Sequence, residues 1–233
     1  MAAQAGYRAW LMFALATATG VVVGAGGLLL VGESRLDSRI RTYILDNPDV
    51  IPEAMKRLEA KRAADSVTAH RADIERPFAS AWAGARDADV TVTMFTDYSC
   101  GYCRASVADV ERLIATDGRV RLVWRELPIL GPGSEVAAMA ALAAAQQGRY
   151  RQFHRQMFAA GPPDSARVAA VARQSGVRLD NDPAYRAELE RNLALARALG
   201  LSGTPTFVVG GEVLQGAVGY DRLRAAVAAA RAG

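Results

Sequence analysis

The sequence predicts an α/β fold for most of the chain, and three observations lead to this prediction. An alternating, β-branched stretch at Val90–Phe95 precedes Cys100 and Cys103, and a stretch with helical spacing follows them. Segments with helical patterns then fill residues 134–199. A short strand, a Gly-Gly turn and a returning strand finally lead into a last helix.

Residues 1–32 form the first of three predicted regions and are expected to carry an export signal. Between Arg8 and Glu33 the chain has 24 residues without a charged side chain, at positions 9–32. Such a stretch is long enough to cross a bilayer as an uncleaved anchor in the inner membrane, although Gly24–Gly26 would also suit a cleaved signal peptide. Both alternatives export the rest of the chain, so we expect a periplasmic or other extracytoplasmic location, where conditions are oxidising.

Residues 33–76 are predicted to form a helical extension. Large apolar residues form two short stripes at helical spacing: Leu36, Ile40 and Ile44, then Val50, Ile51, Met55 and Leu58. After Lys61 the pattern is almost wholly polar as far as Pro77. Because a narrow stripe on a charged helix cannot bury itself alone, the extension either joins copies of the chain into a homo-oligomer or forms a solvated stalk.

Residues 77–233 are predicted to hold the α/β domain. Strands are expected at Phe78–Trp82, Val90–Phe95, Arg119–Leu127, Phe207–Val209 and Glu212–Leu214. Helices are expected after the cysteines up to Gly118, then at Glu135–Gln147, Arg149–Phe158, Ser165–Gln174, Pro183–Leu199 and Tyr220–Ala230. The formal net charge is +4 and the sequence has no dense basic run with interleaved aromatics, so it gives no support for nucleic-acid binding.

Cys100 and Cys103 are the two cysteines of the chain, and three kinds of site compete for their spacing. A zinc site needs four ligands, usually as two pairs, whereas His70 and His154 each stand alone in the sequence. An inert disulfide would close so short a loop that it would constrain the unfolded chain little. The spacing therefore favours a redox pair that cycles between dithiol and disulfide.

The junction between strand and helix predicts different roles for the two cysteines. The first N–H groups of a helix have no partner within the helix and carry partial positive charge, which favours a thiolate at Cys100. We expect Cys100 to be the exposed thiol that attacks a substrate disulfide. Cys103, one turn further along and more buried, is expected to resolve the mixed disulfide.

The strand, Cys-x-x-Cys and helix, followed by Thr204-Pro205 before a strand hairpin and a helix, resemble the thioredoxin fold over about Val90–Ala230. The helical block at 134–199 is similar to the insertion in the DsbA-like variant of that fold. The resemblance implies a cis bond between Thr204 and Pro205 beside the two cysteines. It also implies a redox-active disulfide that needs no other cofactor and no metal.

The residues around the cysteines indicate which thiol chemistry the resemblance implies. Gly101-Tyr102 resembles the DsbC-type isomerases, whereas strong DsbA-type oxidants carry Pro-His there, and Thr204 before the proline also resembles the isomerases. These residues and Pro205 are expected to contact the substrate, with Tyr102 exposed. An isomerase or reductase of unfolded or misoxidised exported proteins, served by a membrane thiol redox partner, is therefore favoured. A DsbA-type oxidase and a non-enzymatic holdase or scaffold are the alternatives.

One position departs from the pattern of the relatives. Many of them have an acidic residue six positions before the first cysteine, which moves the proton of the buried cysteine, and here that position is Met94. Asp97 and Glu126 are candidates to replace it, although both residue types also serve as solvated or capping residues. Tyr98 and His154 are expected to be packing residues.

Overall fold

The computed structural model describes residues 36–232, so the predicted anchor or signal at 9–32 lies outside the described residues. Within residues 36–232, no helix is both long enough and apolar enough to cross a membrane. The chain divides into two compact units, 1–58 and 59–233. The predicted boundary at Pro77 therefore differs from the structure.

The described part of the first unit is helical and exposes apolar side chains. Residues 36–46 form one helix, and α2 (Val50–Ala69) begins after a break at Pro48. Five residues of the predicted stripes are 47–58 % exposed: Leu36, Ile40, Ile51, Met55 and Leu58. The two stripes thus lie on helices, as predicted, and have little apolar cover within the chain.

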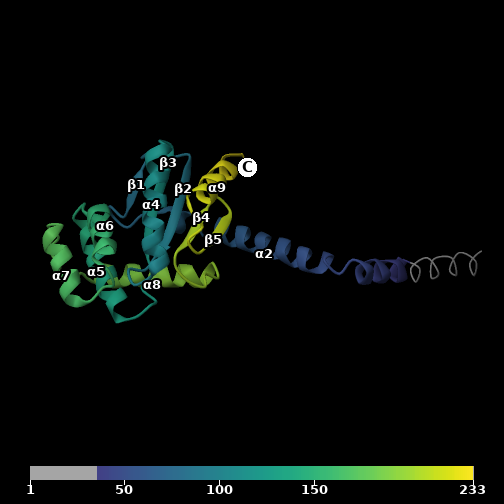
Figure 1. Ribbon diagram of the computed structural model, residues 1–233, viewed down its shortest axis with the longest axis horizontal. Helices are drawn as coiled ribbons and strands as arrows, with labels where there is room; N and C mark the ends of the chain where they lie inside the picture. Colours follow the sequence, from purple (N-terminus) through teal and green to yellow (C-terminus); the bar gives the residue numbers. More distant parts are fainter. Residues whose placement is uncertain (1–35, 233) are drawn as a thin grey trace, which may run out of the picture. The chain divides into compact units, whose positions relative to one another are not determined.

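The second unit contains a five-stranded sheet in the order β1-β3-β2-β4-β5. Its strands are β1 (Trp82–Gly84), β2 (Val90–Thr96), β3 (Val120–Glu126), β4 (Thr206–Val209) and β5 (Glu212–Gln215). β2 runs parallel to β3 and antiparallel to β4, and all seven of its residues are buried (Figure 1). Such a strand is covered on both faces, which explains its almost continuous β-branched and apolar composition.

Helices cover both faces of the sheet and form the predicted insertion. They are α3 (Arg71–Glu75), α4 (Gly101–Thr116), α5 (Pro132–Gln146), α6 (Tyr150–Ala160), α7 (Ser165–Gln174), α8 (Pro183–Ala198) and α9 (Tyr220–Ala232). α4 and α9 contact each other and the sheet, while α5, α6 and α7 pack together as a helical subdomain (Figure 1). The α/β class and the helical block at 134–199 are therefore confirmed.

The two faces of β2 belong to two different apolar clusters. Val92 and Met94 lie in the large cluster that includes Cys103 and residues of α4 and α9. Phe95 lies in a smaller cluster with Val67 and Ile74, and the Thr93 hydroxyl donates to the Ile74 carbonyl at 3.0 Å. Side chains alternate along a strand, so even-numbered residues of β2 face α4 and odd-numbered residues face α3.

The segment before Pro77 is part of the domain, which corrects the predicted boundary. Val67 and Ile74 are 1 % and 2 % exposed. The buried Arg125 guanidinium donates to the backbone carbonyls of Ile74 at 3.3 Å and Arg76 at 2.8 Å. Two isolated apolar residues form no stripe in the sequence, and Arg125, whose guanidinium bonds the backbone around Ile74, lies about fifty residues further along.

The first strand also begins later than predicted. Residues 78–81 form a turn, with a hydrogen bond from Ala81 N to Phe78 O at 2.9 Å, and β1 starts at Trp82. Ala79 has a φ of 47°, which is incompatible with a strand. Phe78 instead packs edge-on against the Tyr185 ring, with a distance of 6.3 Å between the ring centroids. Its apolar character is thus explained by this contact and not by a place in a strand.

Candidate active site

The structure brings Cys100 and Cys103 together with Thr204 and Pro205. Cys100 is the N-cap of α4, and its sulfur accepts a hydrogen bond from the Cys103 N–H at 3.4 Å. The Cys100 Sγ–H donates to the Thr204 carbonyl at 3.1 Å, and the Thr204–Pro205 peptide bond is cis. Two segments about a hundred residues apart therefore meet at one sulfur.

The two thiols lie in different surroundings. Both cysteines are free; Cys100 is 6 % exposed and Cys103 is 0 % exposed. Cys100, expected to be the exposed thiol, is itself largely buried, but it is still the more accessible of the two. Burial raises the pKa of Cys103 to about 12.

Asp97 serves as a capping residue of the loops around the cysteines. Its Oδ1 accepts hydrogen bonds from Ser99 N at 2.8 Å and Ser134 Oγ at 2.6 Å. Its Oδ2 accepts from the backbone N–H groups of Ile129 at 2.9 Å and Leu130 at 3.0 Å. Because both oxygens are occupied by structural donors, the carboxylate is committed to holding three segments together.

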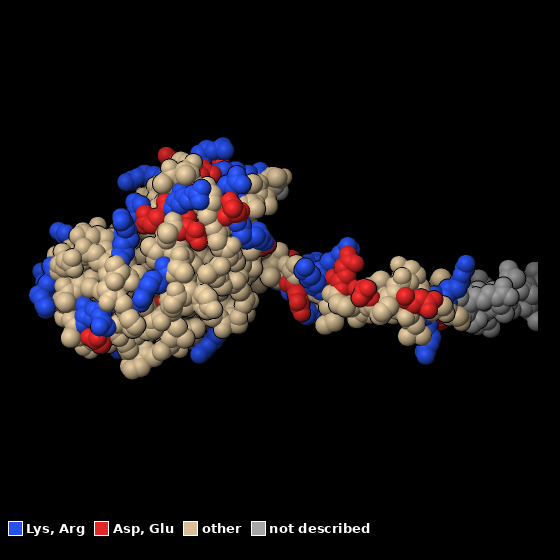
Figure 2. All heavy atoms as spheres, viewed as in Figure 1, with Lys and Arg blue, Asp and Glu red and all other residues tan. Residues whose placement is uncertain are grey.

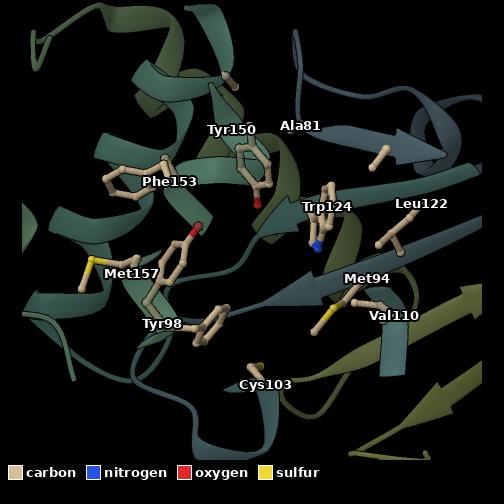
Figure 3. Close-up of a cluster of buried hydrophobic side chains, with 14 of the residues drawn as sticks. Ala81, Met94, Tyr98, Cys103, Val110, Leu122, Trp124, Tyr150, Phe153 and Met157 are labelled. Carbon is tan, nitrogen blue, oxygen red and sulfur yellow. The ribbon is translucent and has the colours of Figure 1, made fainter. Parts of the chain in front are cut away.

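Glu126 lies at the end of β3 in a fully buried polar cluster. The Tyr150 hydroxyl donates to its Oε1 at 2.6 Å and the Tyr98 hydroxyl at 3.2 Å. Burial raises the pKa of Glu126 to about 8, so the carboxyl keeps its proton at neutral pH. In Figure 3 the Tyr98 hydroxyl points toward Tyr150 and away from Cys103. The contacts of Glu126 thus connect the sheet to the helical subdomain.

His154 and Tyr98 are packing residues, as predicted. Both are 1 % exposed, and the Tyr98 hydroxyl lies 3.1 Å from His154 Nδ1. The His154 ring stacks on Tyr150 with a centroid distance of 5.4 Å, and burial lowers the pKa of His154 to about 3. The histidine is therefore neutral and enclosed.

Exposed apolar side chains lie on the loops and the helix start next to Asp97 and the cysteines, and two of them were not singled out by the sequence. Tyr102 is 70 % exposed, as predicted, and a Cβ built on Gly101 would meet no atom within 4 Å. Ile129 and Leu130, held by Asp97, are 44 % and 53 % exposed. In Figure 2 the visible surface of the domain has uncharged areas that are broken by separate groups of charged side chains. One exposed ion pair, Arg186–Glu135 at 3.5 Å, joins α8 to α5. No periodic pattern marks the loop residues Ile129 and Leu130, so their exposure could not be predicted.

The described residues offer no alternative metal centre. Within residues 36–232, no group of three or more His, Cys, Asp or Glu side chains is placed to hold a metal ion. The arrangement around Cys100 and Cys103 is suited to thiol–disulfide exchange, since one thiol is reachable and the other lies directly behind it.

The family profile described as "Thioredoxin" matches residues 78–229. The chain belongs to the thioredoxin family. A second profile, described as the N-terminal domain of the copper resistance protein ScsC, matches residues 33–65. The thioredoxin-family domain thus accounts for the sheet and its helices, and the ScsC-like segment coincides with most of the predicted helical extension.

Solved structures and curated relatives resemble this thioredoxin-family chain. A thioredoxin-like oxidoreductase from Silicibacter pomeroyi is 42 % identical with a TM-score of 0.62, covering 65 % of this chain and 92 % of that one. A linker-deletion variant of Proteus mirabilis ScsC is 26 % identical with a TM-score of 0.71, covering 86 % and 95 %. The Na(+)/H(+) antiporter NhaA 1 of Salinispora arenicola is 33 % identical over 159 residues, which are 64 % of this chain.

These matches define what is established for the domain. The predicted relationship to the DsbA-like thiol–disulfide oxidoreductases is confirmed, and residues 78–229 form a domain of this class. The chain spans 24 % of the length of the NhaA 1 relative.

Glu126 should make the free energy of unfolding fall as pH rises from about 6.5 to about 8. The folded chain keeps a proton on Glu126 that the unfolded chain releases, so stability is full below the ordinary pKa of 4.5 and is lost as pH rises toward about 8. The buried neutral His154 acts in the opposite direction, but only below its ordinary pKa of 6.5. Between pH 6.5 and about pH 8 the free energy of unfolding should therefore fall by about 2 kcal/mol.

The test is urea unfolding over this pH range for the wild type and Glu126→Gln. Glutamine keeps the Oε1 acceptor for both tyrosines, and the variant should lose the pH slope. The exposed Glu190→Gln serves as the matched control and should keep it. An unchanged slope in Glu126→Gln would show that Glu126 is not the group that titrates.

Proposed function

We propose that the chain is an exported thiol–disulfide oxidoreductase that isomerises or reduces disulfides of unfolded or misoxidised exported proteins. Cys100 attacks the substrate disulfide and forms a mixed disulfide, and Cys103 resolves it. The observation that carries this proposal is the hydrogen-bonded arrangement of Cys103 N–H, Cys100 Sγ and the Thr204 carbonyl. It places a buried second thiol behind a more accessible first one.

The surroundings of Cys100 support binding of an extended client segment. Thr204 and Pro205 lie beside the attacking sulfur, and the open space over Gly101 would let another chain approach closely. Tyr102 offers an exposed aromatic ring, and Ile129 and Leu130 add exposed apolar side chains nearby. Such a surface would favour apolar segments, which are exposed in misfolded proteins and buried in native ones.

The proposal includes a location and a reaction partner, which the sequence supports. We place the domain in the periplasm and propose that residues 9–32 tether it to the inner membrane, where a membrane thiol redox partner would keep Cys100 and Cys103 reduced. A reduced pair is needed because an isomerase begins each cycle with a thiolate. Gly101-Tyr102 and Thr204, which contact or flank the sulfurs, support isomerase or reductase character over strong oxidase character.

The reduction potential of the Cys100–Cys103 pair should lie near about −180 mV or below it. It should therefore be lower than the value of about −120 mV typical of DsbA. The measurement is equilibration of the pair with glutathione redox buffers, followed by quantification of free thiols. A potential at or above the DsbA value would make the protein an oxidase and would contradict the proposed direction of exchange.

We also propose that the extension, residues 33–76, joins copies of the chain. Its exposed apolar stripes, for example Ile40 and Met55, would become buried between copies, and the match of residues 33–65 to the ScsC N-terminal domain supports a dedicated role for this segment. Several active sites around one client would hold it by multivalency. Facing copies would also shield Cys100 from a membrane oxidant.

A protein that begins at Glu33 should form an oligomer in light scattering and refold a scrambled disulfide protein. Ile40→Ser with Met55→Ser should lower its mass and its isomerisation rate without changing its reduction potential. Arg39→Ser with Lys56→Ser, at exposed neighbouring positions, is the control. A parent that is already monomeric would overturn the oligomer proposal.

Cys100→Ala should abolish isomerisation, and if it did not, a holdase would be the better account.

A further inference from the structure

Cys103 must lose its proton before it can resolve a mixed disulfide, and the structure lacks the acid that usually assists. Burial raises the pKa of Cys103 to about 12. The position six residues before Cys100 is Met94, which is fully buried in the same apolar cluster as Cys103 (Figure 3). The Asp97 carboxylate is occupied by four structural donors, and Glu126 is hydrogen-bonded by Tyr98 and Tyr150.

Two buried threonine hydroxyls near the cysteines have no hydrogen-bond partner among the described residues. They are Thr96 Oγ1 and Thr204 Oγ1. Buried polar groups are nearly always paired, because an unpaired one costs about 1–3 kcal/mol. Each hydroxyl can therefore still donate a hydrogen bond, and the protein with both thiols reduced and protonated provides no full acceptor for it.

The sheet directs both threonines to the side of Cys103. Even-numbered residues of β2 face α4, so Thr96 follows Met94 on the face that packs against the helix of the cysteines. Thr93, on the opposite face, bonds Ile74 instead. β2 pairs with β4 at Phe95 and Thr206, which brings the end of β2 next to the Thr204–Pro205 segment.

The surroundings of the Cys103 sulfur agree with this placement. Against the dominant effect of burial, the backbone N–H of Asp97 and the hydroxyls of Thr204 and Thr96 each lower the pKa of Cys103. All three are donors, so they favour the thiolate without adding a negative charge of their own.

We propose that Thr96, with Thr204 and the Asp97 N–H, stabilises the thiolate of Cys103 and takes the place of the absent buried acid. This inference rests on the proposed thiol–disulfide exchange. In the step concerned, the Cys103 thiolate attacks Cys100 Sγ of the mixed disulfide. The Cys100–Cys103 bond forms, the bond between Cys100 and the client sulfur breaks, and the client leaves as a thiolate that takes a proton from water. The proton of Cys103 has already passed to water.

The test follows the resolving step itself with the symmetric disulfide of thionitrobenzoate. Reaction with Cys100 releases one coloured thiolate, and attack by Cys103 releases a second, so the rate of the second phase is recorded against pH. Thr96→Val should move the midpoint of this profile to higher pH and slow the second phase at neutral pH about tenfold, the effect expected for losing one hydrogen bond to a charged sulfur. Thr96→Ser should restore both.

Thr93→Val is the matched control, since it removes a buried hydroxyl from the same strand on the opposite face. It should leave the midpoint unchanged even where it lowers stability. An unchanged midpoint in Thr96→Val, an equal shift in Thr93→Val, or a wild type without a second phase would overturn the inference. A shifted midpoint in a protein that fails to refold scrambled clients would support this role of Thr96 while refuting the proposed isomerase function.

Discussion

The carboxylate of Asp97 is the constraint on which the site depends. It is 1 % exposed and accepts four hydrogen bonds, from the loop that leads to Cys100, from the loop after β3 and from the start of α5. A buried carboxylate is tolerated only where such donors surround it. The same residue accepts the Cys100 N–H on its carbonyl at 3.1 Å. One residue, through its side chain and its backbone carbonyl, thus connects the loop before Cys100 with the loop after β3 and the start of α5.

This arrangement gives the two sulfurs their different chemistry. Cys100 is the N-cap of α4, its Sγ–H donates to the Thr204 carbonyl, and a Cβ built on the neighbouring Gly101 would meet no atom within 4 Å. Cys103 lies one turn deeper in the apolar cluster, where burial disfavours its thiolate and only neutral donors oppose that effect. The two acids that were candidates for this role serve other purposes: Asp97 holds loops, and Glu126 bonds Tyr150 of α6 and Tyr98.

The sequence predicted most of the fold because local patterns decide it. The alternation at Val90–Phe95, the helical block and the Thr204-Pro205 hairpin each appear within a short window, and each agrees with the structure. The sequence did not show that Val67 and Ile74 belong to the core, because residues of their apolar cluster, such as Phe95, lie elsewhere in the chain, and the Arg125 that bonds the Ile74 carbonyl is also distant. For Asp97 the sequence left a catalytic and a capping role open, since its partners lie across loops that no periodicity records.

The most direct test of the central claim is to trap the mixed disulfide. Cys100→Ser and Cys103→Ser variants would each be mixed with a peptide disulfide, and the adducts would be mapped by mass spectrometry. The account predicts that Cys103→Ser accumulates the peptide on Cys100, because the resolving thiol is gone, and that Cys100→Ser stays almost unmodified. Equal or faster adduct formation on Cys103 in Cys100→Ser would contradict the assignment of attacking and resolving thiols.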